Sequence, residues 1–379
     1  MTVIRQKVKF DKTLLDQDAL KILKKLTKSG YESYLVGGCI RDILLGHKPK
    51  DFDIATSATP EQIHKLFKHS RIIGKRFKLV HIVFSARKFI EVATFRAGKV
   101  KTTSDGLVLR DNYYGTIEDD VFRRDFSING LYYDINKSEV IDYVGGLKDL
   151  EFLKINMIGI PSERLEEDPV RMIRAIRFQA KLNATIEPRL KEEIQKNSQL
   201  LANIPPARLY EEVIKLFHNE NSIEIFRELD RLGLLKYLFS QTKENSFVDS
   251  SLINTSERIR NGNSVTPAFL FAVFLWSAVN KRFSQISKKN KSRIELMLQA
   301  SEDVINKQTQ QVMMPRWLSS RVKDIWLMQY QLENNNPKKS KVLIRNPRFR
   351  MAYDFLVLRS ESINKDLKAK AEYWTNIQK

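Results

Sequence analysis

The stretch YLVGGCIRDILLGHKPKDFDIATSAT, Tyr34–Thr59, decides the fold of this chain. It begins as a short apolar strand, turns at Gly37-Gly38 and continues as a helix. The alternating segment 51–55 that follows is predicted to be a second strand. Because side chains two apart on a strand share a face, Asp51 and Asp53 should point together while Phe52 and Ile54 enter the core. Paired carboxylates beside a glycine turn that can approach phosphate predict a site for Mg²⁺ and a nucleotide.

Each half of this motif has an ordinary alternative. A Gly-Gly pair after a strand is most often a simple turn, and an isolated Asp-x-Asp pair is most often a solvated strand edge. The combination is more specific, because Arg41 lies one helical turn from Gly38. The spacing therefore favours a functional site over an incidental one.

Charge indicates the kind of partner. The chain has 379 residues, enough for two or three domains, and its 65 Lys and Arg outnumber its 45 Asp and Glu to give a formal net charge of +20. Such an excess favours a polyanionic partner, and a nucleic acid is the first candidate. An excess of lysine on solvated helices is the alternative.

Several classes of protein are disfavoured. The single cysteine, Cys39, excludes an intramolecular disulfide and fits a reducing compartment; a packing residue beside the glycine turn is favoured over a catalytic thiol. The N-terminal residues have no apolar signal core, and the longest uncharged apolar run, Thr266–Val279, is too short to span a bilayer and predicts a buried helix. We expect a cytoplasmic protein. The five histidines lack metal-ligand spacing, so no zinc site is predicted.

Outward from the deciding stretch, the pattern predicts a mixed α/β region. An amphipathic helix is expected over 12–30, another from Thr59 to about residue 68, and strands over 71–73, 80–84 and 89–95. On the last strand Glu91 is a candidate third carboxylate if that strand lies beside Asp51 and Asp53; an ordinary exposed glutamate is the alternative. The polar stretch 96–111 is predicted to be a loop. A basic patch between the first two of these strands contains Lys75, Arg76 and Lys78.

The tripeptide Arg123-Arg124-Asp125 follows a predicted helix start at Ile117. Adjacent guanidinium groups suit triphosphate or RNA phosphate, because each binds paired oxygens in a fixed fork. A surface salt-bridge cluster on the helix is the alternative.

From about residue 150 strand signals become sparse and helices dominate, which predicts an α+β protein. Asp168 precedes Pro169 and could be an ordinary N-cap, or it could form an i,i+3 pair with Arg171. The functional alternative is base recognition, in which a carboxylate accepts from an exocyclic amine while a guanidinium donates to the neighbouring ring nitrogen. Adenine and cytosine both present that edge, so such a pair would admit ATP or CTP and reject GTP or UTP.

The distal half is predicted to be helical around 205–217, 221–239, 267–279, 291–306 and 317–333. The segment Pro337–Arg350 carries six basic residues and no acidic one, and Phe349 is interleaved. It is a candidate contact for the RNA backbone, and a solvated basic linker is the alternative. The basic residues proposed for this contact are Lys338, Lys339, Lys341, Arg345 and Arg348.

The motifs LVGGCIRDILLG, KDFDIAT, RRDFSINGLYYD, DYVGGLKDL and EDPVRMIRAIRF occur in the order found in class II template-independent RNA nucleotidyltransferases. The chain resembles this family, which joins tRNA CCA-adding enzymes and bacterial poly(A) polymerases. The resemblance implies a head with a five-stranded mixed sheet (1–150), a helical neck that reads the base and binds RNA (151–218), and a helical RNA-binding body and tail (219–379).

Site residues follow from the same resemblance. Asp51 and Asp53 match the catalytic metal-binding pair, and Asp125 is a further catalytic candidate. The positions that match nucleotide-binding residues of the family are Gly37, Gly38, Arg41, Arg124, Asp168, Arg171 and Arg174.

One stretch separates the two branches of the family. Residues 72–81, IIGKRFKLVH, are similar to the element that marks bacterial poly(A) polymerases and is absent from their CCA-adding relatives. Further matches are FIEVATFRAG, LRDNYYGTIEDD, IPPARLYEE and NPRFRMAYDFLVLR. The resemblance thus implies addition of AMP from ATP to RNA 3′ ends by a two-metal mechanism that uses Mg²⁺, or alternatively Mn²⁺.

The rivals are a CCA-adding enzyme, a non-catalytic RNA-binding adaptor and a small-molecule nucleotidyltransferase. The expected partners are RNA 3′ ends, ATP and proteins of RNA decay or RNA chaperoning, with no membrane, and we expect a monomer.

Overall fold

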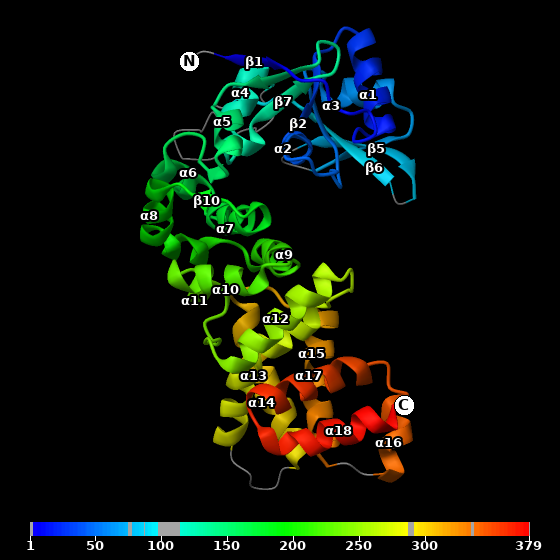
Figure 1. Cartoon of the computed structure of the whole chain (residues 1–379), viewed down its shortest axis with the longest axis vertical. Coiled ribbons are helices and arrows are strands. Elements are labelled where there is room, and N and C mark those ends of the chain that lie inside the picture. Colours follow the sequence, from blue (N-terminus) through cyan, green and yellow to red (C-terminus); the bar gives the residue numbers. More distant parts are fainter. Residues whose placement is uncertain are drawn as a thin grey trace. The chain divides into compact units, whose positions relative to one another are not determined.

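The computed structural model describes residues 3–74, 78–86, 88–97, 114–286, 292–334 and 337–378, with the side chains of 337–339 left out. The chain divides into two compact units. The head unit comprises Met1–Arg164 and Ala184–Leu190, and the helical unit comprises Leu165–Asn183 and Lys191–Lys379. Figure 1 shows both units and labels their helices and strands where there is room.

The head unit is built on one mixed sheet. Its described strands run in the order β1-β8-β7-β2-β3-β6-β5-β4, and β3 and β6 pair in parallel while the other neighbours are antiparallel. A separate parallel pair joins β9 (Lys154–Ile155) to β10 (Thr185–Ile186). The strands of the sheet are β1 (Ile4–Lys7), β2 (Ser33–Val36), β3 (Asp53–Thr56), β4 (Ser70–Ile73), β5 (Leu79–Ser85), β6 (Lys88–Thr94), β7 (Leu131–Asp134) and β8 (Glu139–Asp142).

The α+β class is confirmed, but the described sheet has eight strands instead of the expected five. Two of the additional strands, β1 and β7, lack the alternation of buried and exposed residues by which a strand is detected in a sequence. All four residues of β1 are exposed on a sheet edge, whereas all four residues of β7 are buried. A strand with both faces in the same environment lacks the period-two pattern.

One face of the sheet is covered by α1 (Gln17–Lys28) and α3 (Pro60–Leu66), which pack on β2, β3, β4 and β5. Helix α1 buries one apolar stripe, and Asp16 caps its first turn by accepting from two backbone N–H groups. The predicted start of α3 is confirmed as a capping box, because Thr59 Oγ1 accepts from the Gln62 backbone and Gln62 Oε1 accepts from the Thr59 backbone.

The opposite face is covered only in part. Helix α4 (Ile117–Phe122) contributes Val121 to an apolar cluster with Val36 and Tyr132 on the sheet. Asp53 pairs with Val36 on one side and with Glu91 on the other, so these side chains share this face. The Asp53 end of the face remains accessible, since Asp53 is exposed and the side chain of Glu91 is 45% exposed.

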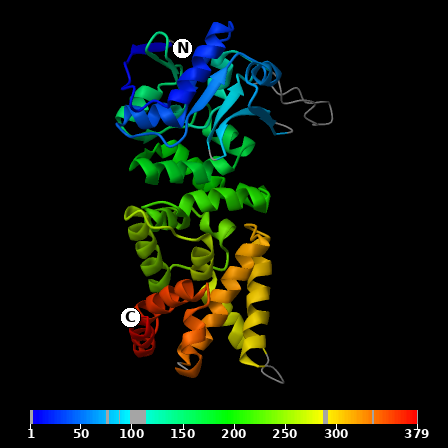
Figure 2. The ribbon, with the colours of Figure 1, turned by 90° about the vertical axis from the view of Figure 1, so that its right-hand side faces the viewer.

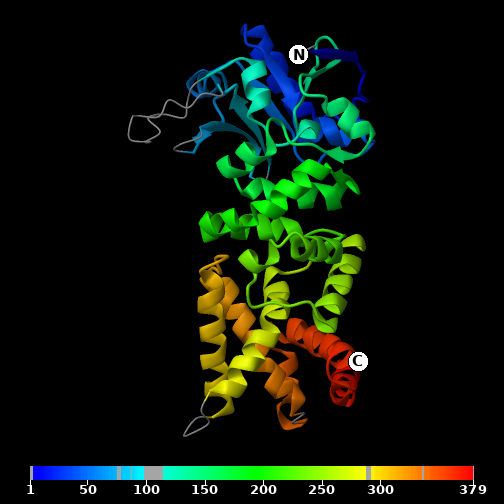
Figure 3. The ribbon, with the colours of Figure 1, turned by 90° about the vertical axis from the view of Figure 1, so that its left-hand side faces the viewer.

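The helical unit is organised around α13 (Pro267–Gln285). Its residues 268–276 are all buried, as predicted for this apolar run, and no described helix is long and apolar enough to cross a membrane. Helices α14 (Arg293–Thr309) and α15 (Arg316–Glu333) lie side by side against it (Figure 2), and α17 (Phe349–Ser362) packs between α15 and α18 (Lys368–Ile377) (Figure 3). The other helices are α2 (Gly38–Leu44), α5 (Gly146–Glu151), α6 (Pro161–Glu167), α7 (Val170–Leu182), α8 (Pro188–Lys196), α9 (Pro206–Phe217), α10 (Ser222–Arg231), α11 (Leu235–Leu238), α12 (Ser246–Arg260) and α16 (Pro337–Ile344), with 3₁₀ turns η1 (Ser127–Asn129), η2 (Ser198–Asn203) and η3 (Lys365–Leu367).

Candidate active site

The structure brings Asp51 and Asp53 together at the start of β3. The strand begins at Asp53, two residues later than predicted, and neither carboxylate has a hydrogen bond or ion pair with any described residue. Although the Asp53 side chain reaches solvent, partial burial together with the negative charges of Glu91 and Asp51 raises its pKa to about 6, while Arg124 acts in the opposite direction. The site therefore concentrates negative charge that the neighbouring residues do not neutralise.

The sequence made Glu91 a candidate third carboxylate if its strand lay beside Asp51 and Asp53, and the structure meets this condition. Strand β6 lies beside β3, and Glu91 is the direct partner of Asp53 in the parallel register. Within the described ranges, no three His, Cys, Asp or Glu side chains form a cluster that could enclose a metal ion. The donor set nevertheless fits Mg²⁺, because the ion prefers oxygen ligands and usually keeps several waters alongside one or two carboxylates.

The glycine turn lies next to two guanidinium groups. Gly37 has φ +77° and ψ −130°, a conformation that a residue with a Cβ rarely adopts, and Gly38 begins α2. A Cβ on Gly37 would lie 3.4 Å from Arg124 Nη1, and one on Gly38 would lie 3.5 Å from Arg41 Nη2. Two of the four arginines predicted to bind nucleotide, Arg41 and Arg124, are thus brought to this turn.

Arg41 is buried and its guanidinium is held within the protein. Its Nη1 donates to Asn129 Oδ1 at 2.6 Å, and its Nε and Nη2 donate to Asp42 Oδ1 at 2.9 and 2.6 Å. Asn129 Nδ2 in turn donates to Asp125 Oδ1 at 3.2 Å, and the backbone N–H of Phe126 donates to the same oxygen at 2.8 Å. Asp125 therefore orders turn η1 and, through Asn129, the side chain of Arg41.

Arg124 is anchored differently. Its Nη2 donates to Asp120 Oδ2 at 3.0 Å and its Nε to the Tyr132 hydroxyl at 2.9 Å, while that hydroxyl donates to Asp120 Oδ2 at 2.5 Å. Burial alone would lower the pKa of Arg124, but Tyr132 and Asp120 outweigh it and raise the pKa. No described residue accepts from Nη1, the nitrogen beside Gly37, so this donor remains available to a ligand.

Sequence patterns did not identify Asn129, Asp120 or Tyr132 as part of the site. Asp120 and Tyr132 lie twelve positions apart and meet only through the fold. The signal that could have found them is the motif match itself, since all three lie inside the two stretches LRDNYYGTIEDD and RRDFSINGLYYD.

Cys39 is a packing residue, as expected. It is buried, and its Sγ donates to the Val36 carbonyl at 3.4 Å. Burial and the charge of Asp53 raise the pKa of the thiol to about 12, so the reactive thiolate is absent at neutral pH.

In the helical unit, Asp168 and Arg171 flank the start of α7 but have different partners. Asp168 Oδ2 accepts from Arg208 Nη2 at 2.7 Å and its Oδ1 accepts from the Val170 backbone at 3.2 Å, whereas Arg171 Nη1 donates to Glu167 Oε2 at 2.8 Å. The i,i+3 ion pair between Asp168 and Arg171 is therefore not formed. Arg208, on α9, is a neighbour that the sequence pattern did not indicate.

Arg174 lies one turn further along α7, where its guanidinium carbon is 6.0 Å from the centre of the Phe178 ring. It also takes part in a further interaction, so its side chain is not free.

The predicted RNA-binding residues have different environments. Lys341 and Arg345 are exposed, Arg348 lies 3.6 Å from Asp324, and Lys78 pairs with Glu61 at 3.0 Å. Residues 337–344 form helix α16 instead of an irregular linker, and whether the basic residues of this stretch contact RNA stays a prediction. Lys75 and Arg76, the predicted loop beyond residue 97, and the side chains of Lys338 and Lys339 lie outside the described residues.

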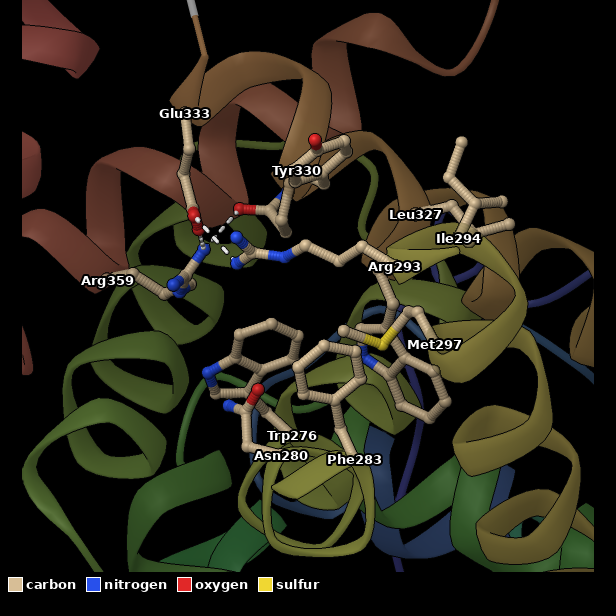
Figure 4. Close-up of a pocket in the computed structure, with 12 residues that line it drawn as sticks. Trp276, Asn280, Phe283, Arg293, Ile294, Met297, Leu327, Tyr330, Glu333 and Arg359 are labelled. Carbon is tan, nitrogen blue, oxygen red and sulfur yellow. Dashed lines mark hydrogen bonds and ion pairs between the residues drawn. The ribbon is translucent and has the colours of Figure 1, made fainter. Parts of the chain in front are cut away.

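A recess in the helical unit lies apart from all predicted site residues. It encloses about 100 Å³ between α13, α14, α15 and α17, and aromatic rings form one wall (Figure 4). Arg359 lines it, lies over the ring of Trp276 at 4.5 Å and donates from Nη1 to Glu333 at 2.8 Å and to Gln329 at 3.0 Å. These contacts join α13, α15 and α17, which gives the arginine a structural role.

Comparison with known proteins matches both units. Three family models match: the poly A polymerase head domain over residues 33–156, a probable RNA and SrmB-binding site of polymerase A over 183–245, and the polymerase A arginine-rich C-terminus over 289–379. Poly(A) polymerase I of Salmonella typhi is 40% identical over 400 residues, covering 100% of this chain and 86% of the relative.

CCA-adding enzymes are similar over less of the sequence. That of Lactobacillus delbrueckii subsp. bulgaricus is 35% identical over 218 residues, which is 57% of this chain and 54% of that protein. The solved structure of the Bacillus stearothermophilus CCA-adding enzyme in complex with CTP shares the fold, with a TM-score of 0.64 at 24% identity over 94% of this chain and 81% of that one. Full-length identity distinguishes the two branches, and the chain belongs to the bacterial poly(A) polymerase family.

Proposed function

We propose that this chain transfers adenylate from ATP to RNA 3′ ends without a template and releases pyrophosphate. The relatives that match its whole length are poly(A) polymerases. One observation carries the proposal at the level of residues: among the described residues, Asp51 and Asp53 have no partner beside the Gly37-Gly38 turn, and none accepts from Arg124 Nη1. A non-catalytic RNA-binding protein that kept this fold would not need to keep this uncompensated charge.

Asp51 and Asp53 would hold Mg²⁺, or alternatively Mn²⁺, with Glu91 as the third carboxylate. The uncompensated charge that raises the pKa of Asp53 supports a divalent cation at this place. When bound, the ions supply charge neutralisation at the α-phosphate and lower the pKa of the attacking 3′-hydroxyl.

The head residues around the turn would orient the triphosphate. Arg124 donates from Nη1, held in place by Asp120 and Tyr132, and the glycine backbone allows close approach of phosphate oxygens. Arg41 and Asp125 act mainly by ordering the turn, because the guanidinium nitrogens of Arg41 and the Oδ1 atom of Asp125 are engaged in protein contacts. Positioning of this kind supplies much of the rate of a phosphoryl-type transfer.

Base selection would fall to the start of α7. Asp168 accepts from the exocyclic amine of adenine and Arg171 donates to the neighbouring ring nitrogen, as the sequence suggested, and Arg208 would fix the Asp168 carboxylate. Arg174 remains a candidate nucleotide contact on the next turn. RNA would be held chiefly by its backbone along the basic helical residues, in keeping with the net charge of +20.

We also propose the subdivision of the helical part into a neck (151–218) and a body with tail (219–379), a monomeric state, and partners from RNA decay or RNA chaperoning. The matched RNA-binding region at 183–245 overlaps the proposed neck and supports its contact with RNA.

Nucleotide incorporation tests the proposal. A generic RNA and a tRNA are each incubated with Mg²⁺ and one of the four nucleoside triphosphates. We expect long adenylate tails on the generic RNA, and a loss on the order of a thousandfold in Asp51→Ala and in Asp53→Ala. Glu151→Ala, which removes an exposed carboxylate of the head, is the matched control.

Two outcomes would overturn the assignment. Addition of C, C and A to tRNA alone would identify the CCA-adding branch. Binding of RNA with no incorporation in Mg²⁺ or Mn²⁺ would identify an adaptor.

A further inference from the structure

A row of polar side chains crosses the open face of the head sheet. In register across β3, β6 and β5 lie Asp53, Glu91 and His81, each the direct partner of the next. Direct partners on one face have their Cβ atoms about 5 Å apart, so the row extends from the metal-binding pair to the imidazole without a break.

His81 makes a specific contact with Glu91. Its Nε2 lies 3.2 Å from Glu91 Oε1, and because a carboxylate offers only acceptors, Nε2 is the nitrogen that carries the proton in this contact. The ring also stacks on Phe89, with centroids 4.2 Å apart and planes 16° apart. Phe89 and Glu91 are two apart on β6 and share a face, so one strand fixes both the position and the plane of the imidazole.

Glu91 needs such support. Its side chain is 45% exposed, and a glutamate has three rotatable bonds, so without a partner it would sample many rotamers beside Asp53. In the described part of the chain, His81 is the partner that holds it. His81 itself is 23% exposed and is therefore the better fixed member of the pair.

We propose that His81 is a positioning residue that holds the Glu91 carboxylate on the face of the sheet shared with Asp53, where it would add a further oxygen ligand to the Asp51 and Asp53 pair when the metal is bound. This inference rests on the proposed function of the Asp51 and Asp53 site. Outer partners that orient a metal ligand typically contribute 10- to 100-fold to metal affinity.

The test is Mn²⁺ binding to the full chain without RNA or ATP, followed by the paramagnetic signal of free Mn²⁺. We expect His81→Ala to raise the dissociation constant about tenfold. His81→Gln, whose amide can donate to Glu91, should recover most of the affinity. In a Glu91→Gln background, His81→Ala should have no further effect, because the group that it positions is already lost. His69→Ala, an exposed histidine of the same unit, is the control.

The inference is overturned if His81→Ala binds Mn²⁺ with wild-type affinity. It is also overturned if His81→Ala lowers the Mn²⁺ affinity by the same factor in the wild-type and Glu91→Gln backgrounds. Thermal melting of each variant separates misfolding from loss of binding, and His81→Gln covers the case in which the alanine variant fails to fold. Failure here is distinguishable from failure of the proposed function. If the wild type extends RNA and Asp53→Ala does not, the adenylyl-transfer assignment stands whatever the His81 variants show.

Discussion

At the scale of single residues, the site is marked by polar groups that lack the partners expected of them. Most carboxylates in the described head make hydrogen bonds or ion pairs, as Asp16, Asp120 and Asp142 do, whereas Asp51 and Asp53 make none. A folded protein keeps such groups against their electrostatic cost where a ligand uses them.

This cost predicts how stability depends on pH. The folded-state pKa of Asp53, about 6, lies above the ordinary aspartate value of 3.8, so the ionised carboxylate destabilises the fold above pH 6 and the penalty disappears below about pH 4. In metal-free buffer at pH 7.5, Asp53→Asn should stabilise the chain by on the order of 1 kcal/mol, less than the full shift implies because the side chain reaches solvent. The gain should vanish near pH 4.

Thermal melting in EDTA at the two pH values measures the effect, with Glu151→Gln as the matched control. Mg²⁺ should raise the melting temperature of the wild type and leave that of Asp53→Asn unchanged. A melting temperature of Asp53→Asn at or below that of the wild type, in EDTA at pH 7.5, would contradict this account.

Base choice also belongs to the residue scale. If Asp168 reads the exocyclic amine, Asp168→Asn should lower the preference for ATP over GTP by about tenfold or more, since a good paired contact to a base discriminates by about 1–3 kcal/mol. Arg208→Ala should shift the preference in the same direction by a smaller factor, because it frees the carboxylate that it now holds.

Competition between the two nucleotides in single incorporations measures the ratio. Arg231→Ala, which removes an exposed arginine paired with Glu228 in the same unit, is the control. An unchanged ratio in Asp168→Asn would remove this residue from base recognition.

At the scale of elements, the sequence predicted what local patterns encode. The strand-turn-helix at 34–44, the start of α3 at Thr59 and the buried helix α13 all follow from periodicity and capping residues. Strands β1 and β7 were missed because neither has an inner and an outer face. The Asp168–Arg208 pair was missed because it joins residues 40 positions apart, a relation that no local pattern contains.

The glycine turn gives a prediction about an element. Gly37→Ala places a Cβ at φ +77° and ψ −130°, which should cost about 1–3 kcal/mol in backbone strain and shift the backbone of the turn beside Arg124. We expect a lower melting temperature together with a raised KM for ATP. Gly38→Ala is the matched control for stability, because the added Cβ meets only ordinary contacts and the residue lies inside a helix. Equal melting temperatures for the two variants would show that the backbone at Gly37 is not restrictive.

At the scale of the whole molecule, the net charge of +20 predicts how RNA affinity responds to salt. Each phosphate contact to a single strand adds about 0.7 to the slope of log affinity against log salt concentration. Exchanging both Lys341 and Arg345 for serine should therefore reduce the slope by about 1.4 if both contact phosphate.

Filter binding of a short RNA from 50 to 400 mM salt measures the slope. Lys24→Ser with Lys28→Ser makes the same change of charge on exposed positions of α1 and should leave the slope closer to that of the wild type. Equal slopes for the two double variants would remove α16 and the residues after it as a specific RNA contact.

The short pairing of β9 with β10 limits how this polymerase can be taken apart. Residues 184–190 return to the head unit after α7 has already entered the helical one, and Thr185–Ile186 complete the strand pair that Lys154–Ile155 begins. No single cleavage can release an intact head: a fragment that stops before residue 184 leaves β9 unpaired, and one that continues past it carries α7 along. Chimaeras that exchange catalytic modules between relatives must therefore be joined beyond residue 190, with α7 included.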